Sequence, residues 1–223
     1  MTLRIGVLGG TFNPIHIGHL RAAEEAMEAL ALDTFLFLPA ALPPHKPGQE
    51  TASFEHRWQM LRAAITGNPL FRASDLELSL SGASYTVLSL QALRKEFGMG
   101  GTIYFLLGLD AFLEINTWWH YMELFELASM VVLRRPRYQE LELEKMLCGQ
   151  ISSLYAWDPE SSCYRHPRLF PVYYLKITRI DVSSTQIRSR IRTGKSIRYL
   201  VPTECIAYIK NWGLYGPTEI FAE

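Results

Sequence analysis

The sequence is poor in the features that mark secreted, zinc-binding or membrane-embedded proteins. Its 223 residues contain three cysteines, whose odd number and wide spacing fit neither a small disulfide framework nor a zinc site. We therefore expect reduced thiols and a cytoplasmic protein. The chain does not open with a basic stretch followed by an apolar one, so we expect no signal peptide. No apolar run approaches the roughly 20 residues that a membrane span needs.

The chain also lacks an excess of charge of either sign. Its 22 lysines and arginines balance 22 aspartates and glutamates. This balance argues against an extended nucleic-acid surface and against a membrane partner. A site for anions therefore has to be built from a few basic residues placed locally. The hydrophobic content of 48% is ordinary for a globular protein with a real core.

Apolar runs typical of buried strands alternate with amphipathic segments typical of helices. The expected strands are 3–8, 34–38, 71–80 with a turn near Asp75, 102–107, 130–133 and 173–177. The expected helices are 20–31, 53–65 capped by Ser53, 84–97 capped by Ser84, 141–147, 183–191 and 203–211. The stretch around 161–162 is expected to be a loop.

This alternation implies crossover connections and a parallel sheet. We find no repeat and no clear linker, so we predict a single α/β domain over residues 1–223. Helices are expected on both faces of the sheet. Residues from about 173 to 223 are expected to form a small C-terminal helical subdomain.

The joint between the first strand and the first helix reads GGTFNPIHIGH, from Gly9 to His19. The carboxyl end of a strand in an open α/β sheet is where ligands bind, and the following helix start attracts anions. The glycine spacing is not that of a dinucleotide-binding fingerprint. Gly194-Lys195-Ser196 imitates the end of a P-loop, but Ser189 stands where the upstream glycine is required.

His16 and His19 are three residues apart, so at a helix start they face the same side. Imidazoles there can donate hydrogen bonds to phosphate oxygens. The alternative is a capping turn that carries two polar histidines. The pair behind two glycines favours the phosphate site.

His16-Ile17-Gly18-His19 resembles the H-x-G-H motif of the nucleotidylyltransferase superfamily. The resemblance implies a Rossmann-like sheet that binds a nucleoside triphosphate and transfers a nucleotidyl group, releasing pyrophosphate. It implies that His16 and His19 meet the α- and β-phosphates. Backbone contacts are implied for Gly9, Gly10, Thr11 and Phe12. Asn13 stands where some members have aspartate.

A second landmark is DVSSTQIRSRIR near the C-terminus. Ser183 and Gln186 have the spacing of a capping box, and Arg188 lies one helical turn further on. Alone, the stretch reads as a capped surface helix. Beside the histidine motif it resembles the S-S-T-x-I-R element of the same superfamily. The resemblance implies that Ser184 and Thr185 contact the triphosphate and that Arg188 stabilises the leaving pyrophosphate.

Further elements resemble those of the bacterial nicotinate mononucleotide adenylyltransferases. They are the P-P-H-K loop 43–46, the S-Y-T element 84–86, the G-x-D element 108–110, the T-W pair 117–118 and the R-R-P element 134–136. They occur in the family's order, and only about 137–172 lies outside the resemblance. The implied reaction joins ATP and nicotinate mononucleotide into nicotinate adenine dinucleotide and pyrophosphate.

The same resemblance implies roles for single residues. Lys46 would meet the attacking phosphate or the triphosphate. Trp118 would stack on the pyridine ring, while Thr86 and a backbone N–H near Trp119 would bind the nicotinate carboxylate. The mononucleotide-binding set also includes Arg134, and the adenosine-binding set includes Gly108 and Asp110. Mg²⁺ is expected on the triphosphate, held by phosphate oxygens and water without a protein ligand.

Three other interpretations stay open at this point. One is a different adenylyltransferase of the superfamily, acting on phosphopantetheine or nicotinamide mononucleotide. Another is a catalytically silent nucleotide-binding regulator. The third is a nucleic-acid-binding module related to class I synthetases, which the neutral charge disfavours. The sequence leaves the oligomeric state open, a homodimer included.

Overall fold

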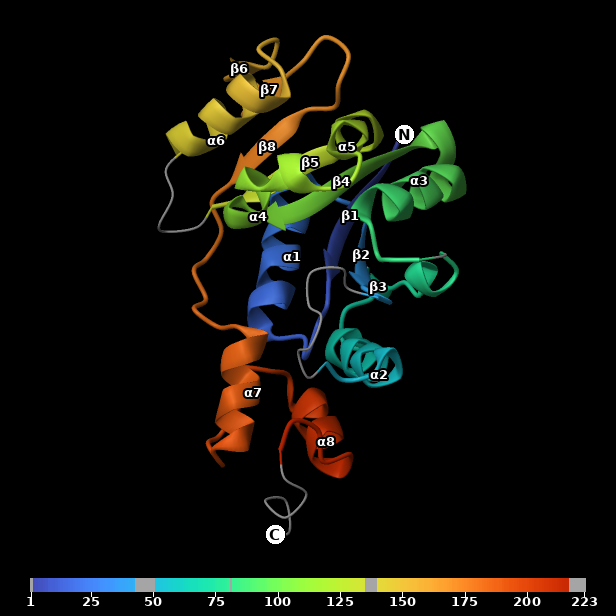
Figure 1. The fold of residues 1–223 in the computed structure, drawn as a ribbon, viewed down its shortest axis with the longest axis vertical. Helices are drawn as coiled ribbons and strands as arrows, with labels where there is room; N and C mark the ends of the chain where they lie inside the picture. Colours follow the sequence, from blue (N-terminus) through green and yellow to red (C-terminus); the bar gives the residue numbers. More distant parts are fainter. Residues whose placement is uncertain (1, 43–50, 81, 135–139, 217–223) are drawn as a thin grey trace.

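The computed structural model describes residues 2–42, 51–80, 82–134 and 140–216. Its sheet has eight strands in the order β3-β2-β1-β4-β5-β8-β7-β6 (Figure 1). The strands are β1 Leu3–Gly10, β2 Thr34–Pro39, β3 Phe71–Ala73, β4 Gly101–Gly108, β5 Ser129–Leu133, β6 Ala156–Asp158, β7 Cys163–Arg165 and β8 Val172–Leu175.

Helices connect the strands and cover both faces of the sheet (Figure 1). The α-helices are α1 Ile17–Leu30, α2 Phe54–Ile65, α3 Thr86–Phe97, α4 Leu109–Leu113, α5 Tyr121–Leu127, α6 Glu140–Met146, α7 Ser184–Arg192 and α8 Thr203–Asn211. Short 3-10 helices span Leu76–Leu78, Gly98–Gly100 and Ile115–Thr117, and a π-helix spans Leu147–Ile151.

The strands β1 to β5 and β8 are parallel, as the alternating pattern predicts. Strand β7 runs antiparallel to both of its neighbours, so the sheet is mixed. The hairpin of β6 and β7 was not predicted, and the expected loop at 161–162 is its connection. Each of the two strands has three residues and includes a charged one, Asp158 or Arg165, so no apolar alternation marks them.

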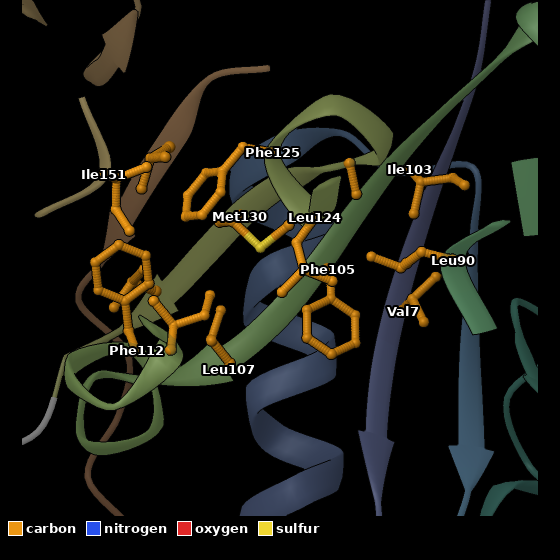
Figure 2. Close-up of a cluster of buried hydrophobic side chains, with 14 of the residues drawn as sticks. Val7, Leu90, Ile103, Phe105, Leu107, Phe112, Leu124, Phe125, Met130 and Ile151 are labelled. Carbon is orange, nitrogen blue, oxygen red and sulfur yellow. The ribbon is translucent and has the colours of Figure 1, made fainter. Parts of the chain in front are cut away.

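Alternate residues of the central strands belong to two separate hydrophobic cores. Along β4, Phe105 and Leu107 face one core, and Tyr104 and Leu106 face the other. The first core packs against α3, α5 and α6, and Figure 2 shows Leu90 of α3 beside the strands. The second core packs against α1, α2, α7 and α8. The buried side chains of the last two helices therefore belong to the same core as the first two.

Two local predictions were wrong. The strand expected over 71–80 ends at Ala73, and the 3-10 helix Leu76–Leu78 follows. This turn brings the buried Glu77 carboxylate to the Ser89 hydroxyl, which donates to it at 2.7 Å. Helix α3 begins at Thr86, so its cap is Tyr85 and not Ser84. The Ser84 hydroxyl instead accepts a hydrogen bond from the N–H of Leu42.

The cap predictions at the other two helix starts are confirmed. Ser53 accepts a hydrogen bond from the N–H of His56 at the start of α2. Ser183 does the same for the N–H of Gln186 at the start of α7. Within the described residues, none of the helices is long and apolar enough to cross a membrane.

Candidate functional site

A cavity of about 850 Å³ opens where the carboxyl ends of β1, β4 and β5 meet the starts of α1 and α7. This edge is where an open parallel sheet binds ligands. The cavity brings together eleven of the predicted site residues, from both ends of the chain: Gly9, Thr11, Phe12, His16, His19, Gly108, Trp118, Arg134, Ser184, Thr185 and Arg188.

The described lining of the cavity carries charge of one sign only. It includes Arg134, Lys176, Arg179 and Arg188, and neither aspartate nor glutamate lies among its described residues. The chain as a whole is neutral, so this is a local concentration of positive charge. Such a lining favours ligands with several negative charges.

The two histidines lie together at the start of α1. Their rings are stacked, with centroids 3.6 Å apart and planes at 20°. The Nδ1 atom of His19 accepts a hydrogen bond from the backbone N–H of His16 at 3.3 Å. In the neutral ring this assigns the proton of His19 to Nε2, which is then the donor nitrogen. The buried Phe12 ring packs edge-to-face with the His19 ring, with centroids 5.1 Å apart, and so restricts its orientation.

Gly18 allows this close arrangement. A Cβ atom at residue 18 would lie 3.1 Å from Nδ1 of His16 and 3.1 Å from Cγ1 of Val182. Both distances are tighter than ordinary contacts, so a side chain there would push the imidazole or the segment before α7. The glycine of the histidine motif therefore has a packing role beside the site.

The start of α7 is bound to the loop that follows β1. The Ser184 hydroxyl donates to the carbonyl of Pro14 at 2.8 Å. The buried Arg188 donates from Nη1 to the carbonyl of Asn13 at 2.8 Å and from Nη2 to Oγ1 of Thr185 at 3.3 Å. These bonds set the α7 N-terminus, which attracts anions, beside the histidines.

The side chain of Asn13 has a structural role that the sequence did not indicate. Its Oδ1 atom accepts from the N–H of Ala52 at 3.1 Å and from the hydroxyl of Tyr215 at 2.7 Å. Burial raises the pKa of Tyr215 far above neutral pH, so the phenol remains a donor. The asparagine thus ties the loop after β1 to two distant segments.

Other predicted residues lie outside this cavity. Gly10 ends β1, and its carbonyl accepts from the N–H of Ala40 at 2.9 Å. Asp110 lies in the first turn of α4, and Thr86 is the first residue of α3. The exposed ring of Trp119 packs on Tyr85 with centroids 5.0 Å apart. Lys46 lies outside the described residues.

The sequence reasoning missed two groups near the site. The connector between β8 and α7 lines the cavity with Lys176, Thr178 and Arg179. The N–H of Thr178 donates to the Glu25 carboxylate of α1 at 2.7 Å. The other missed residue is Arg57 of α2, which contacts the carbonyl of Thr11. A signal for Arg57 was present, because it shares a helical face with the buried Met60 and Leu61.

The chain is similar to known proteins over nearly its whole length. Residues 7–190 match the model of the cytidylyltransferase-like family. The chain is 45% identical over 215 residues to a probable nicotinate-nucleotide adenylyltransferase of Trichlorobacter lovleyi, covering 96% of this chain and 100% of that protein. It is 41% identical over 219 residues to the protein so named in Desulfatibacillum aliphaticivorans, with 96% and 100% covered.

Among solved structures, the fold is similar to the Plasmodium falciparum nicotinic acid mononucleotide adenylyltransferase complexed with NaAD. The TM-score is 0.73 at 20% sequence identity, with 96% of this chain and 97% of that chain covered. A putative nicotinate-nucleotide adenylyltransferase of Vibrio parahaemolyticus gives a TM-score of 0.63 at 19% identity, with 96% and 95% covered. At these identities the likeness concerns the fold.

Proposed function

The chain belongs to the cytidylyltransferase-like family and, within it, to the nicotinate-nucleotide adenylyltransferases, and from this we infer its reaction. It transfers the adenylyl group of ATP to nicotinate mononucleotide. The products are nicotinate adenine dinucleotide and pyrophosphate, which gives the enzyme its place in NAD biosynthesis.

One observation carries this conclusion beyond the family relation. The stacked His16 and His19, the start of α7 and four basic side chains meet around one cavity whose described lining holds no carboxylate. Two anionic substrates have to be brought together in the reaction. A cavity of this charge lowers the electrostatic cost of doing so.

We propose that catalysis is positioning together with charge stabilisation. The attacking phosphate of the mononucleotide is already an anion at neutral pH, so it needs no general base. It attacks the α-phosphorus of ATP in line, the new P–O bond forms, and the bond to pyrophosphate breaks. Orientation supplies on the order of 7–11 kcal/mol of the barrier, and each donor aimed at the developing charge about 3–4 kcal/mol.

The donors proposed for the triphosphate are His16 and His19, with Nε2 of His19 carrying the proton. The backbone of Gly9, Gly10, Thr11 and Phe12 and the start of α7 complete this half of the site. Arg188 stabilises the leaving pyrophosphate. Because Ser184 already donates its hydroxyl proton to Pro14, we propose that it contacts the triphosphate through its backbone N–H.

The other half of the site is proposed to hold the mononucleotide. Trp118 lines the cavity and is proposed to stack on the pyridine ring. Thr86, a backbone N–H near Trp119 and Arg134 are proposed to bind the mononucleotide. Lys46 is proposed to meet either the attacking phosphate or the triphosphate. A carboxylate surrounded by N–H donors is preferred over an amide, whose NH₂ would face another donor.

We propose that Gly108 and Asp110 contact the adenosine part of ATP. Mg²⁺ is proposed to accompany ATP and would be held by phosphate oxygens and water, where it would neutralise charge on the triphosphate. We propose a single domain over 1–223, whose part from about 173 completes the ATP site.

The test is pyrophosphate release with ATP and Mg²⁺, offering nicotinate mononucleotide, nicotinamide mononucleotide and phosphopantetheine in parallel. We expect a strong preference for the nicotinate compound. Turnover with another acceptor alone would reject the proposed mononucleotide site and keep adenylyl transfer. Binding of ATP without turnover of any acceptor would indicate a regulator.

A further inference from the structure

Arg57 of α2 is a charged side chain in a place where charge is costly. It is 2% exposed, and burial lowers the pKa of its guanidinium. An apolar side chain of similar length would fill the same space without that cost. The role of Arg57 must therefore lie in the hydrogen bonds that its guanidinium donates.

These hydrogen bonds join the loop after β1 to the residues just before α2. Nη1 donates to the carbonyl of Thr11 at 2.8 Å, in the loop after β1. Nε donates to the carbonyl of Ala52 at 3.0 Å, close after the segment that carries Lys46. The N–H of Ala52 is held in turn by Oδ1 of Asn13 at 3.1 Å. The carbonyl of Ala52 is thus bound to Arg57, and its N–H is bound to Asn13, which lies in the loop after β1.

The bond to Thr11 determines the direction of a donor. In a planar trans peptide, the carbonyl of one residue and the N–H of the next point in opposite directions. Arg57 draws the Thr11 carbonyl toward itself, so the N–H of Phe12 points away from Arg57. Thr11 and Phe12 line the cavity and Arg57 does not. The geometry therefore aims the Phe12 N–H toward the cavity side of the loop.

We propose that Arg57 is a positioning residue for the phosphate site, an inference that rests on the proposed adenylyl transfer. It holds the loop after β1 so that the Phe12 N–H meets a phosphate oxygen of ATP. It also fixes Ala52 relative to that loop. Arg57 itself does not touch a substrate.

Arg94 of α3 provides a matched control. Its guanidinium also donates to two backbone carbonyls, those of Leu127 and Gly101, the latter at 2.6 Å. Burial lowers its pKa as well, and it lies over an aromatic ring, as Arg57 does. However, Gly101 begins β4, so this arginine acts at the edge of the sheet opposite the cavity.

The experiment compares Arg57→Met, Arg57→Lys and Arg94→Met. We expect both methionine variants to melt at lower temperature than the wild type. Assayed well below their melting temperatures, Arg57→Met should lose at least tenfold in kcat/KM for pyrophosphate release and in affinity for inorganic pyrophosphate. Arg94→Met should stay within about twofold in both. Arg57→Lys, which keeps a donor but not the fork, should lie between. Equal losses in the two methionine variants would overturn the proposal.

A second variant covers the case in which Arg57→Met does not fold. Replacing residue 12 by the α-hydroxy analogue of phenylalanine turns its N–H into an ester oxygen, weakens the Thr11 carbonyl as an acceptor and keeps the Arg57 side chain. We expect at least a tenfold loss of affinity for inorganic pyrophosphate, measured by calorimetry. Unchanged affinity would overturn the proposal.

The pyrophosphate measurement separates this proposal from the proposed function. A wild-type protein that binds pyrophosphate and does not turn over ATP with nicotinate mononucleotide would reject the function. The role of Arg57 would then still be decided by the pyrophosphate affinities of the variants. A wild type that binds neither pyrophosphate nor ATP would reject both.

Discussion

The Nη1 atom of Arg188 donates a hydrogen bond to the carbonyl of Asn13 across 175 residues of sequence, at 2.8 Å. The bond joins α7 to the loop after β1, beside the helix start that carries the histidines. The same guanidinium has a second contact, 3.3 Å from Oγ1 of Thr185. Arg188 therefore holds the loop, and in the proposed site it is also expected to offer its positive charge to the pyrophosphate.

Replacing Arg188 with lysine should separate these functions. Lysine keeps the positive charge but not the planar fork, so it cannot hold Asn13 and Thr185 together. We expect Arg188→Ala to lower kcat by about 10²-fold. Arg188→Lys should lower it less, because the charge remains. Steady-state pyrophosphate release measures both variants. A lysine variant as impaired as alanine would show that the fork matters and the charge alone does not.

His19→Ala should lower kcat by about 10²–10³-fold, because it removes a donor from the developing negative charge. His56 of α2 is the matched control, since its ring contacts the hydroxyl of Tyr208 at 3.0 Å and does not line the cavity. His56→Ala should keep nearly the wild-type rate. A near-wild-type rate for His19→Ala would exclude His19 from the mechanism.

Trp118 and Trp119 form a neighbouring pair for a test of the pyridine site. Trp118 lines the cavity, whereas Trp119 is 47% exposed and packs on Tyr85. Trp118→Ala should raise the Kd of nicotinate mononucleotide about fivefold, since stacking is worth on the order of 1 kcal/mol. It should change ATP binding much less. Calorimetry with each substrate decides this, and equal loss for both would mean that the stacking role is misassigned.

Glu25→Gln should destabilise the protein in a way that depends on pH. Burial raises the pKa of Glu25, but hydrogen bonds from Thr178 and Arg21 outweigh it, so the pKa is lowered below its ordinary value of 4.5. The folded state then binds fewer protons than the unfolded one, and this stabilisation is present above pH 4.5. It is lost as the pH falls through the lowered pKa of the folded protein.

We therefore expect the free energy of unfolding of the glutamine variant to be lower by about 1–2 kcal/mol at pH 7. The difference from the wild type should vanish in acid. Urea denaturation of both proteins from pH 7 down to pH 3 measures it. A difference that is constant over this range would mean that the carboxylate charge is not the stabilising group.

Much of the fold could be predicted because its strands are buried and its helices are amphipathic. The runs at 3–8 and 102–107 are apolar and end at glycines, and the structure has β1 and β4 there. Strands β6 and β7 are too short for periodicity to reveal them. Strand β7 pairs with both β6 and β8, and these pairings depend on contacts between segments that no local pattern records.

The candidate site also has features that the sequence could predict and features that it could not. The positions of the histidine motif and of Ser183 at helix starts could be predicted, because a helix start leaves a local signal in the sequence. The hydrogen-bond partners of Arg57 and Glu25 could not be predicted. Each binds a backbone group, and every residue has the same backbone. Which carbonyl or N–H is within reach is decided only when the chain is folded.

The joining of Asn13 to Arg188 and Tyr215 also has a consequence for synthesis. On the ribosome, the glycines and histidines of residues 9–19 emerge long before Arg188 and Tyr215, which fix their loop. The growing polypeptide can form β1 and α1 early, because domains begin to fold from the N-terminus. By contrast, we expect enzymatic activity only after Arg188 has been synthesised, because the proposed site includes it. A chain that ends before residue 188 is therefore expected to contain both histidines and to be inactive.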